Sequence, residues 1–230
     1  VEGYLDVIGL WQAGVRNAVA TCGTAVAADH AKRLSGLVNR VYLLFDGDQA
    51  GRTAAARAFG AFVNSGMDVS AVFLPEGEDP DTIAIKHREQ TKSYLEGLRA
   101  EAHTLLECLL DSLFVKQGVS GVKGLGAAAK AKLCEDLARS LCRVENKIEQ
   151  SELIGKAALQ LMVDRVRLEE LVSAVARGEE ARIEVDLPAD ENVEEDAASG
   201  PDRIKRIEDL PAVDRSLLHA VIAKKEELAE

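Results

Sequence analysis

Aromatic residues and long apolar runs are scarce in this chain. Phe, Tyr and Trp together make up 4% of the 230 residues, so any core must be built mainly from aliphatic side chains and alanine. There is no run of 18 apolar residues, which argues against a membrane-spanning helix. No basic start followed by an apolar centre marks a secretory signal peptide. We therefore expect no membrane partner.

Cysteines are few and widely separated. Cys22, Cys108, Cys134 and Cys142 follow none of the spacings that are typical of zinc sites. We expect them to be small buried hydrophobes in a reducing compartment, and we expect no zinc site in this chain.

Basic residues are outnumbered, 28 against 39 acidic ones, which gives a net charge of −11. This balance argues against a broad nucleic-acid-binding face on the chain. The excess is concentrated in residues 178–212, which hold twelve acidic and four basic residues together with Pro188, Pro201 and Pro211. Such a composition is typical of a linker, and we interpret residues 178–212 as an acidic linker.

Helical and strand patterns alternate in residues 1–90. The predicted helices are Tyr4–Ala13, Ala27–Val38, Ala50–Asn64 and Asp81–His87, and the predicted strands are Asn17–Thr21, Val41–Phe45 and Val69–Leu74. Alternation of this kind predicts an α/β domain with a mainly parallel sheet that is covered on both faces.

Residues 91–177 have a different character. Apolar residues recur at helical spacing, which predicts helices over Leu95–Val115, Ala127–Val144 and Ile148–Val175 and hence an α-helical bundle. Residues 213–230 form one further amphipathic helix in this interpretation. That helix needs a partner, because a single helix cannot bury its own apolar face.

The stretch "VYLLFDGDQAG" ends the second predicted strand with two aspartates, Asp46 and Asp48. A strand that stops there places both carboxylates at its carboxyl end, where open α/β sheets bind ligands. Carboxylates held close together repel each other unless protons or cations intervene. Oxygen ligands in a loop suit Mg²⁺ or Mn²⁺ better than zinc.

A second acidic cluster follows the next strand. In "PEGEDPDTI" the residues Asp79 and Asp81 are again one residue apart, and Glu2 lies at the very start of the chain. Because adjacent parallel strands bring their carboxyl ends together, we expect the two aspartate pairs to converge.

Asp46 and Asp48 allow two other interpretations. A calcium loop of the EF-hand type requires an oxygen ligand at Ala50 and a Glu at Arg57, so that interpretation fails. A phosphatase with an aspartyl nucleophile also carries two such aspartates after a strand. It usually has Thr or Val where Ala50 stands, and it remains the weaker alternative.

Three segments carry a resemblance to a known family. "VEGYLDVIGLWQAGVRNAVATCGTAV", "VYLLFDGDQAGRTAAARA" and "VFLPEGEDPDTI" are similar, in order and spacing, to the Toprim module of bacterial DnaG-type primases. The resemblance covers residues 1–90. Residues 91–177 resemble, more loosely, the helical part that follows Toprim in those enzymes, and residues 213–230 resemble the start of their helicase-binding region. The implied fold is Rossmann-like Toprim, incomplete at its amino-terminal end, followed by a helical bundle.

The resemblance also implies roles for individual residues. Glu2 is implied as the acid/base or metal-organising carboxylate, and Asp46 and Asp48 as catalytic metal ligands. Asp79 and Asp81 complete the implied metal and nucleotide site. The implied nucleotide or phosphate vicinity comprises Gly23, Thr24, Gly47 and Gly51. Asp6 belongs to the same motif, but its role stays open between the site and a local helix cap.

The implied activity is synthesis of RNA primers on a single-stranded DNA template from nucleoside triphosphates, with Mg²⁺ or Mn²⁺. The implied partner is a DnaB-type replicative helicase, and the implied location is the bacterial cytoplasm. The family carries a zinc module and a basic subdomain ahead of the point where this sequence begins. We therefore expect a fragment of a longer protein, inactive in isolation, with zinc bound only in the missing module.

Two competing hypotheses belong to other classes. The first is another Toprim enzyme, a topoisomerase or nuclease, which would need a catalytic Tyr domain or an ATPase domain. The second is a non-catalytic module that docks on a helicase and retains the acidic residues as relics. The presence of all five acidic site residues argues against relics, since each could have been lost singly.

Overall fold

The computed structural model describes residues 1–23 and 25–178. The chain divides into two units, residues 1–181 and 182–230, and the fold below is that of the first. Thr24, the acidic linker from residue 179 onward and the predicted helix 213–230 lie outside the described residues. Among the described helices, none is long and apolar enough to cross a membrane.

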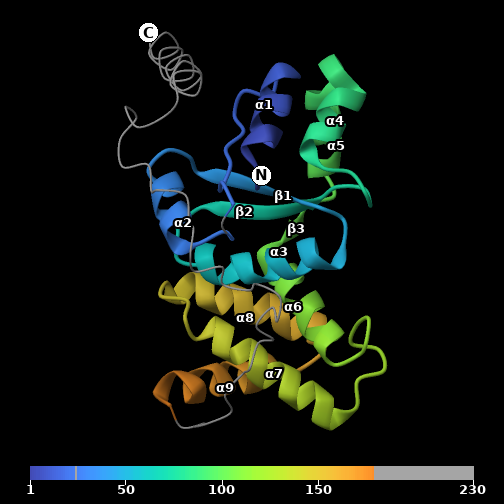
Figure 1. Ribbon diagram of the computed structural model, residues 1–230. Helices are drawn as coiled ribbons and strands as arrows, with labels where there is room; N and C mark the ends of the chain where they lie inside the picture. The colour runs from blue at the N-terminus through green and yellow to red at the C-terminus, as the bar shows by residue number, and fades with distance from the viewer. Residues whose placement is uncertain (24, 179–230) are drawn as a thin grey trace, which may run out of the picture. The chain divides into compact units, whose positions relative to one another are not determined.

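A small mixed sheet lies at the centre of the first half of the chain (Figure 1). Strand β1 (Arg40–Phe45) pairs in parallel with β2 (Asp68–Phe73), so that Phe45 lies opposite Phe73 at their carboxyl ends. The two-residue strand β3 (His103–Thr104) joins the other edge of β2 in antiparallel orientation. The carboxyl ends of β1 and β2 therefore meet at one edge of the sheet.

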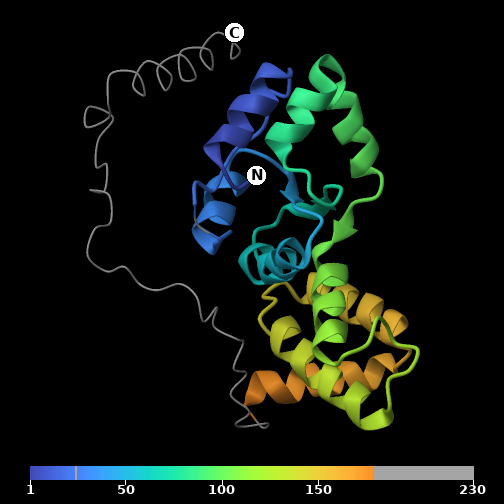
Figure 2. The ribbon, with the colours of Figure 1, turned by 45° about the vertical axis from the view of Figure 1, so that its right-hand side comes forward.

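Helices cover both faces of this sheet. On one face, α1 (Tyr4–Gln12), α4 (Pro80–His87) and α5 (Thr91–Arg99) share a core made of Leu10, Leu74, Ile83, Ala84 and Leu95. A short 3-10 helix, η1 (Arg88–Gln90), separates α4 from α5. On the other face lie α2 (Ala28–Ser35) and α3 (Gln49–Phe62). Figures 1 and 2 both show α1 beside α4, with α3 across the sheet.

The rest of the described chain is helical. It comprises α6 (Leu105–Lys116), α7 (Ala127–Leu141), α8 (Lys147–Leu161) and α9 (Arg165–Arg177). Helix α6 packs against α3, and one continuous core runs from Phe45 and Phe59 into the bundle, where Leu133, Leu137 and Leu141 are fully buried. The two halves therefore share one core.

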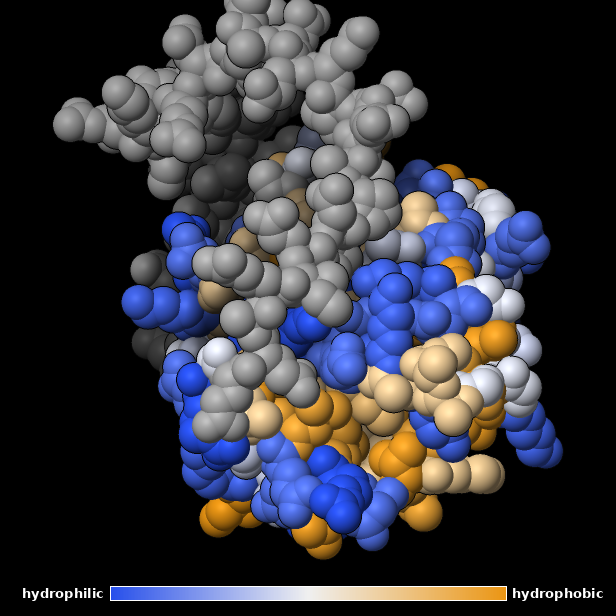
Figure 3. All heavy atoms as spheres, turned by 90° about the horizontal axis from the view of Figure 1, so that it is seen from below, coloured by the Kyte–Doolittle hydropathy of each residue, from blue (hydrophilic) through white to orange (hydrophobic). Residues whose placement is uncertain are grey.

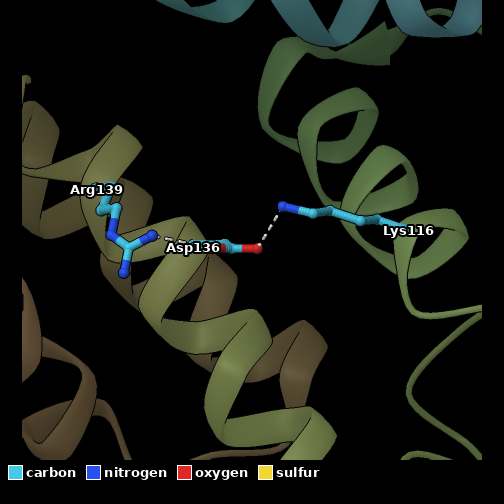
Figure 4. A network of polar contacts seen from close by, with 3 residues as sticks. All are labelled: Lys116, Asp136 and Arg139. Carbon is cyan, nitrogen blue, oxygen red and sulfur yellow. Dashed lines mark hydrogen bonds and ion pairs between the residues drawn. The ribbon is translucent and has the colours of Figure 1, made fainter. Parts of the chain in front are cut away.

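An ion-pair network around one buried carboxylate links α6 to α7 (Figure 4). The Asp136 carboxylate, whose side chain is only 8% exposed, lies 3.1 Å from Lys116 Nζ and 3.3 Å from an Arg139 guanidinium nitrogen. Two cations compensate one buried carboxylate, which meets the requirement for keeping that charge out of water.

Seen from the α9 end, the apolar surface is broken into small patches by hydrophilic residues (Figure 3).

The predicted alternation of helices and strands in residues 1–90 is confirmed within a few residues, with one exception. The predicted strand Asn17–Thr21 is wrong, because this segment is irregular. It is held instead by single backbone hydrogen bonds, among them those from Thr21 N to Val1 O and from the Val1 nitrogen to Val19 O. These single bonds do not form a strand ladder in the described residues.

Two predicted long helices are each broken in the structure. Leu95–Val115 divides into α5, β3 and α6, because His103 and Thr104 pair with β2 and Thr104 starts a new helix through a capping box with Glu107. Ile148–Val175 divides into α8 and α9 at Met162, whose backbone is left-handed with φ of 51°, and Asp164 caps α9. Polar caps override the helical periodicity at both breaks.

Candidate active site

Aspartates occupy both loops that follow the parallel strands. Asp46 comes directly after β1, and Asp48 is the amino-terminal cap of α3, where its Oδ1 accepts a 2.7 Å hydrogen bond from the Gly51 N–H. Asp79 caps α4 in the same way, with Oδ1 accepting a 2.6 Å bond from the Thr82 N–H. Each cap fixes one carboxylate at the positive end of a helix dipole.

Two glycines hold the chain segments of this edge in close contact. A Cβ atom on Gly47 would lie 2.2 Å from the Leu74 carbonyl oxygen, and one on Gly51 would lie 2.2 Å from the Asp46 carbonyl oxygen. Neither position has room for a side chain. Both glycines therefore have a packing role, and their implied role beside phosphates stays a prediction.

Asp46 lies within the electrostatic field of other carboxylates. Partial burial raises the pKa of Asp46, and the neighbouring charges of Asp48, Asp79 and Asp6 raise it further. By contrast, the pKa of Asp79 is lowered, because the backbone N–H and then the hydroxyl of Thr82 donate hydrogen bonds to its carboxylate. The charge of Asp79 therefore acts on Asp46 across the two loops, whereas Asp81 is not among the charges that act on Asp46.

Asp6, on α1, also belongs to this cluster. The sequence left its role open between the site and a helix cap, and the structure shows elements of both. Its Oδ2 accepts a 2.9 Å hydrogen bond from the Gly3 N–H, so the side chain caps α1. Its negative charge also raises the pKa of Asp46. The sequence signal that could have placed it was its position four residues after Glu2 in the same motif.

The structure places the other predicted residues less centrally. The half-buried Asp81 packs against α1, where a Cβ on Gly9 would come 2.3 Å from its Oδ1. The Glu2 side chain is exposed and its backbone carbonyl accepts a bond from Cys22 N. Neither carboxylate is among the charges that raise the pKa of Asp46. Gly23 follows Cys22 with φ of +83°, and its neighbour Thr24 is not described.

The donor chemistry of this cluster fits a hard divalent cation. Carboxylate oxygens are the ligands that Mg²⁺ and Mn²⁺ prefer, and the repulsion at Asp46 is of the kind that a cation relieves. None of the ion pairs within residues 1–23 and 25–178 supplies Asp6, Asp46, Asp48 or Asp79 with a Lys or Arg partner. In the same residues no three Asp, Glu, His or Cys side chains form a ready metal-binding group. Binding would therefore require the carboxylates to draw together.

Comparison with known proteins identifies the first part of the chain. A family model described as Toprim-like matches residues 1–84, which include every carboxylate of this candidate site. Residues 1–84 are therefore similar to a Toprim-like domain. Its paired aspartates lie at the carboxyl ends of the two parallel strands of this domain.

The chain is also similar to bacterial DNA primases. The DNA primase of Pseudomonas aeruginosa is 39% identical over 160 residues, and that of Escherichia coli K12 is 39% identical over 127 residues. A crystal structure of a DNA primase domain from Pseudomonas aeruginosa matches with a TM-score of 0.64 and 34% identity, covering 75% of this chain and 53% of that one. A DnaG catalytic domain solved with single-stranded DNA matches with a TM-score of 0.62 and 31% identity, covering 73% of this chain and 51% of that one.

These findings confirm the predicted resemblance to DnaG-type primases and the predicted fold, Toprim followed by helices. The match covers 67% of this chain but 24% of the Pseudomonas aeruginosa primase, and 54% of this chain but 21% of the Escherichia coli one. The chain thus spans about a quarter of the length of these curated relatives.

Proposed function

We propose that this chain is the Toprim and helical part of a DNA primase, which makes RNA primers on a single-stranded DNA template during replication. The observation that carries the proposal is the match to DNA primases over the region that contains both aspartate loops. The enzyme would be a metal-dependent nucleotidyltransferase. In this proposal the activity belongs to the longer protein, and the 230-residue chain alone does not make primers.

The residues that would hold divalent metal are Asp46 and Asp48 after β1 and Asp79 and Asp81 at the start of α4, with Glu2 as the acid/base or metal-organising group. Divalent cations bound there would supply Lewis acidity and alignment for nucleotidyl transfer. Mg²⁺ or Mn²⁺ suits the all-oxygen donor set.

The chain's own contribution is to hold the carboxylates in place before substrate arrives. Asp48 and Asp79 are fixed as helix caps by the Gly51 and Thr82 N–H groups. The charge of Asp46 is disfavoured, because partial desolvation and three like charges act on it. A cation is therefore favoured there more than at an isolated surface aspartate.

The proposed partners follow from the relatives. One DnaG catalytic domain of the same fold was solved with single-stranded DNA, which supports a single-stranded template here. Nucleoside triphosphates would be the substrates, and a DnaB-type helicase would bind through the region that begins at residues 213–230. The proposed location is the bacterial cytoplasm. The relatives named above are all DNA primases, which favours this function over a topoisomerase, a nuclease or a non-catalytic module.

The test is a chimeric primase. The matching stretch of the Pseudomonas aeruginosa enzyme is replaced by residues 1–178 of this chain, and primer synthesis on single-stranded DNA is measured with Mg²⁺ and with Mn²⁺. We expect metal-dependent primers from the chimera. The same chimera with Asp48→Asn should make none, because Asn preserves the α3 cap but removes a metal-binding charge.

Asp164→Asn provides the matched control, since Asp164 caps α9 in the same manner, away from the aspartate loops. This variant should retain synthesis. A folded chimera that makes no primers, or one in which Asp48→Asn is as active as the parent chimera, would contradict the proposed function.

A further inference from the structure

We propose that Glu78, tied to Lys86, is a positioning residue that fixes Asp79 against the rest of the carboxylate cluster. The inference rests on the proposed metal-dependent function, since it concerns how that site is held in shape. It adds two residues to the machinery that the aspartate motifs alone do not indicate.

The contact spans the length of α4. Glu78 immediately precedes the helix cap Asp79, and Lys86 lies in the last turn of the same helix. Glu78 Oε1 accepts a hydrogen bond from Lys86 Nζ within an ion pair, and the Glu78 N–H donates to the Pro75 carbonyl at 3.0 Å. The turn Pro75–Glu78 is thereby fastened to the body of α4.

This ion pair differs from an ordinary surface pair in the burial of its acid. The Glu78 side chain is 17% exposed, while that of Lys86 is 59% exposed. Glu78 Oε2 is buried, and no hydrogen-bond partner for it lies among the described residues. Because a buried carboxylate is costly without a cation, Lys86 strongly restrains where Glu78 and the adjoining Asp79 can lie.

The opposite side of the same turn is restrained by the β1 loop. The Leu74 carbonyl and the Glu76 nitrogen approach Gly47 so closely that a Cβ there would lie 2.2 Å and 3.2 Å from them. The turn that leads to Asp79 is therefore held between the Asp46–Asp48 loop and the Glu78–Lys86 pair. Releasing the Lys86 side would let Asp79 move away from Asp46.

Simple electrostatics and positioning make opposite predictions for Lys86→Met. Removing a positive charge near a cation site should strengthen divalent-ion binding if only the net charge matters. If Lys86 positions Asp79 through Glu78, the same substitution should weaken binding. Loss of a residue that orients metal ligands typically lowers affinity about 10- to 100-fold.

The experiment measures Mn²⁺ binding to the full 230-residue chain by electron paramagnetic resonance. We expect Lys86→Met to weaken binding about tenfold, and Lys86→Arg, which can keep the ion pair, to stay within about twofold of the parent chain. Glu78→Gln and Glu76→Gln remove the same charge from the same turn, and only Glu78→Gln should weaken binding about tenfold. Lys116→Met, which removes a cation from the buried Asp136, is the control for general loss of stability.

A second readout needs no metal. The Thr82 N–H that donates to Asp79 should exchange with solvent faster in Lys86→Met than in the parent chain, and at the parent rate in Lys116→Met. Mn²⁺ binding by Lys86→Met as tight as the parent's, or tighter, would overturn the inference and leave the proposed function intact. Absence of saturable Mn²⁺ binding by the parent chain would contradict the proposed function. In that case, an unchanged exchange rate of the Thr82 N–H in Lys86→Met would overturn the inference as well.

Discussion

At the scale of single residues, Asp46 is the carboxylate on which unfavourable electrostatic interactions act within the site. Its charge is disfavoured by partial burial and by the carboxylates of Asp48, Asp79 and Asp6. A charged residue in an unfavourable environment is typical of a functional site. There the side chain serves to bind a ligand and not to stabilise the free protein. The two helix caps in the same cluster, Asp48 and Asp79, stabilise their helices at the same time.

Asp46→Asn should raise the stability of the metal-free chain. The raised pKa means that the folded state favours the protonated carboxyl, so the charged form costs stability once the pH rises through that pKa. The gain from Asn should therefore be present at pH 7 and absent at pH 3. Because the side chain is largely open to solvent, we expect only about 1–3 °C in Tm.

Thermal unfolding followed by circular dichroism measures this difference. Glu152→Gln on α8 removes an exposed charge far along the chain and serves as the control, with no comparable gain. A lower Tm for Asp46→Asn at pH 7, or a gain that persists unchanged at pH 3, would show that like-charge repulsion is not what acts on Asp46.

At the scale of elements, the sequence predicted most helices and strands of residues 1–90, although the segment Asn17–Thr21 is irregular and not a strand. The apolar run Val41–Phe45 gave a strand, and Asp46 and Asp48 marked its carboxyl end, which was enough to predict where the two acidic loops would meet. Sequence reasoning failed where a polar cap competed with apolar periodicity, as at Thr104 and Asp164, because each cap starts a helix inside an apparently continuous pattern. The approach of Asp6 to Asp46 depends on tertiary packing, and the Glu78–Lys86 ion pair depends on where α4 begins and ends, so periodicity could not reveal either.

Helix α3 offers a test of the close packing between its first turn and the end of β1. Gly51→Ala would place a Cβ 2.2 Å from the Asp46 carbonyl oxygen, so we expect a loss of about 1–3 kcal/mol in the free energy of unfolding. Gly60→Ala, near the other end of α3, meets nothing within 4 Å and should gain up to about 1 kcal/mol from helix propensity. Urea unfolding of both variants gives the comparison.

The two substitutions are chemically identical and lie in one helix, so their opposite signs isolate the contact. Equal changes in the free energy of unfolding for Gly51→Ala and Gly60→Ala would mean that the loop after β1 can move to make room for the added methyl group. The rigid spacing that we assign to Asp46 and Asp48 would then be wrong.

At the scale of the whole described molecule, the sheet and the helical bundle share one core. Residues from β1, α3, α6, α7, α8 and α9 belong to the same buried cluster, and the Asn64 side chain links the end of α3 to the bundle through Arg143 O and Glu145 N. We therefore expect residues 1–178 to unfold as one cooperative unit, although the family model matches only residues 1–84.

Leu137→Ala tests this cooperativity at a distance. Leu137 is fully buried in α7, and its truncation should cost about 2–5 kcal/mol. The single tryptophan, Trp11, lies on α1 in the Toprim-like domain, so its fluorescence reports on the other half. We expect the fluorescence and circular dichroism transitions to shift together. Leu159→Ala, at a position that is 80% exposed, should shift neither, and an unchanged Trp11 transition in Leu137→Ala would mean that the halves unfold independently.

The central claim is that the aspartates at the ends of β1 and β2 form a divalent-metal site. The most direct test is Mn²⁺ titration of the 230-residue chain and of its Asp46→Asn/Asp48→Asn double variant. Asn keeps the size of both side chains and the cap of α3, so the fold should persist while the charges are lost. The account predicts saturable binding by the parent chain and a loss of at least about tenfold in affinity in the double variant. Equal binding by the two proteins would contradict it.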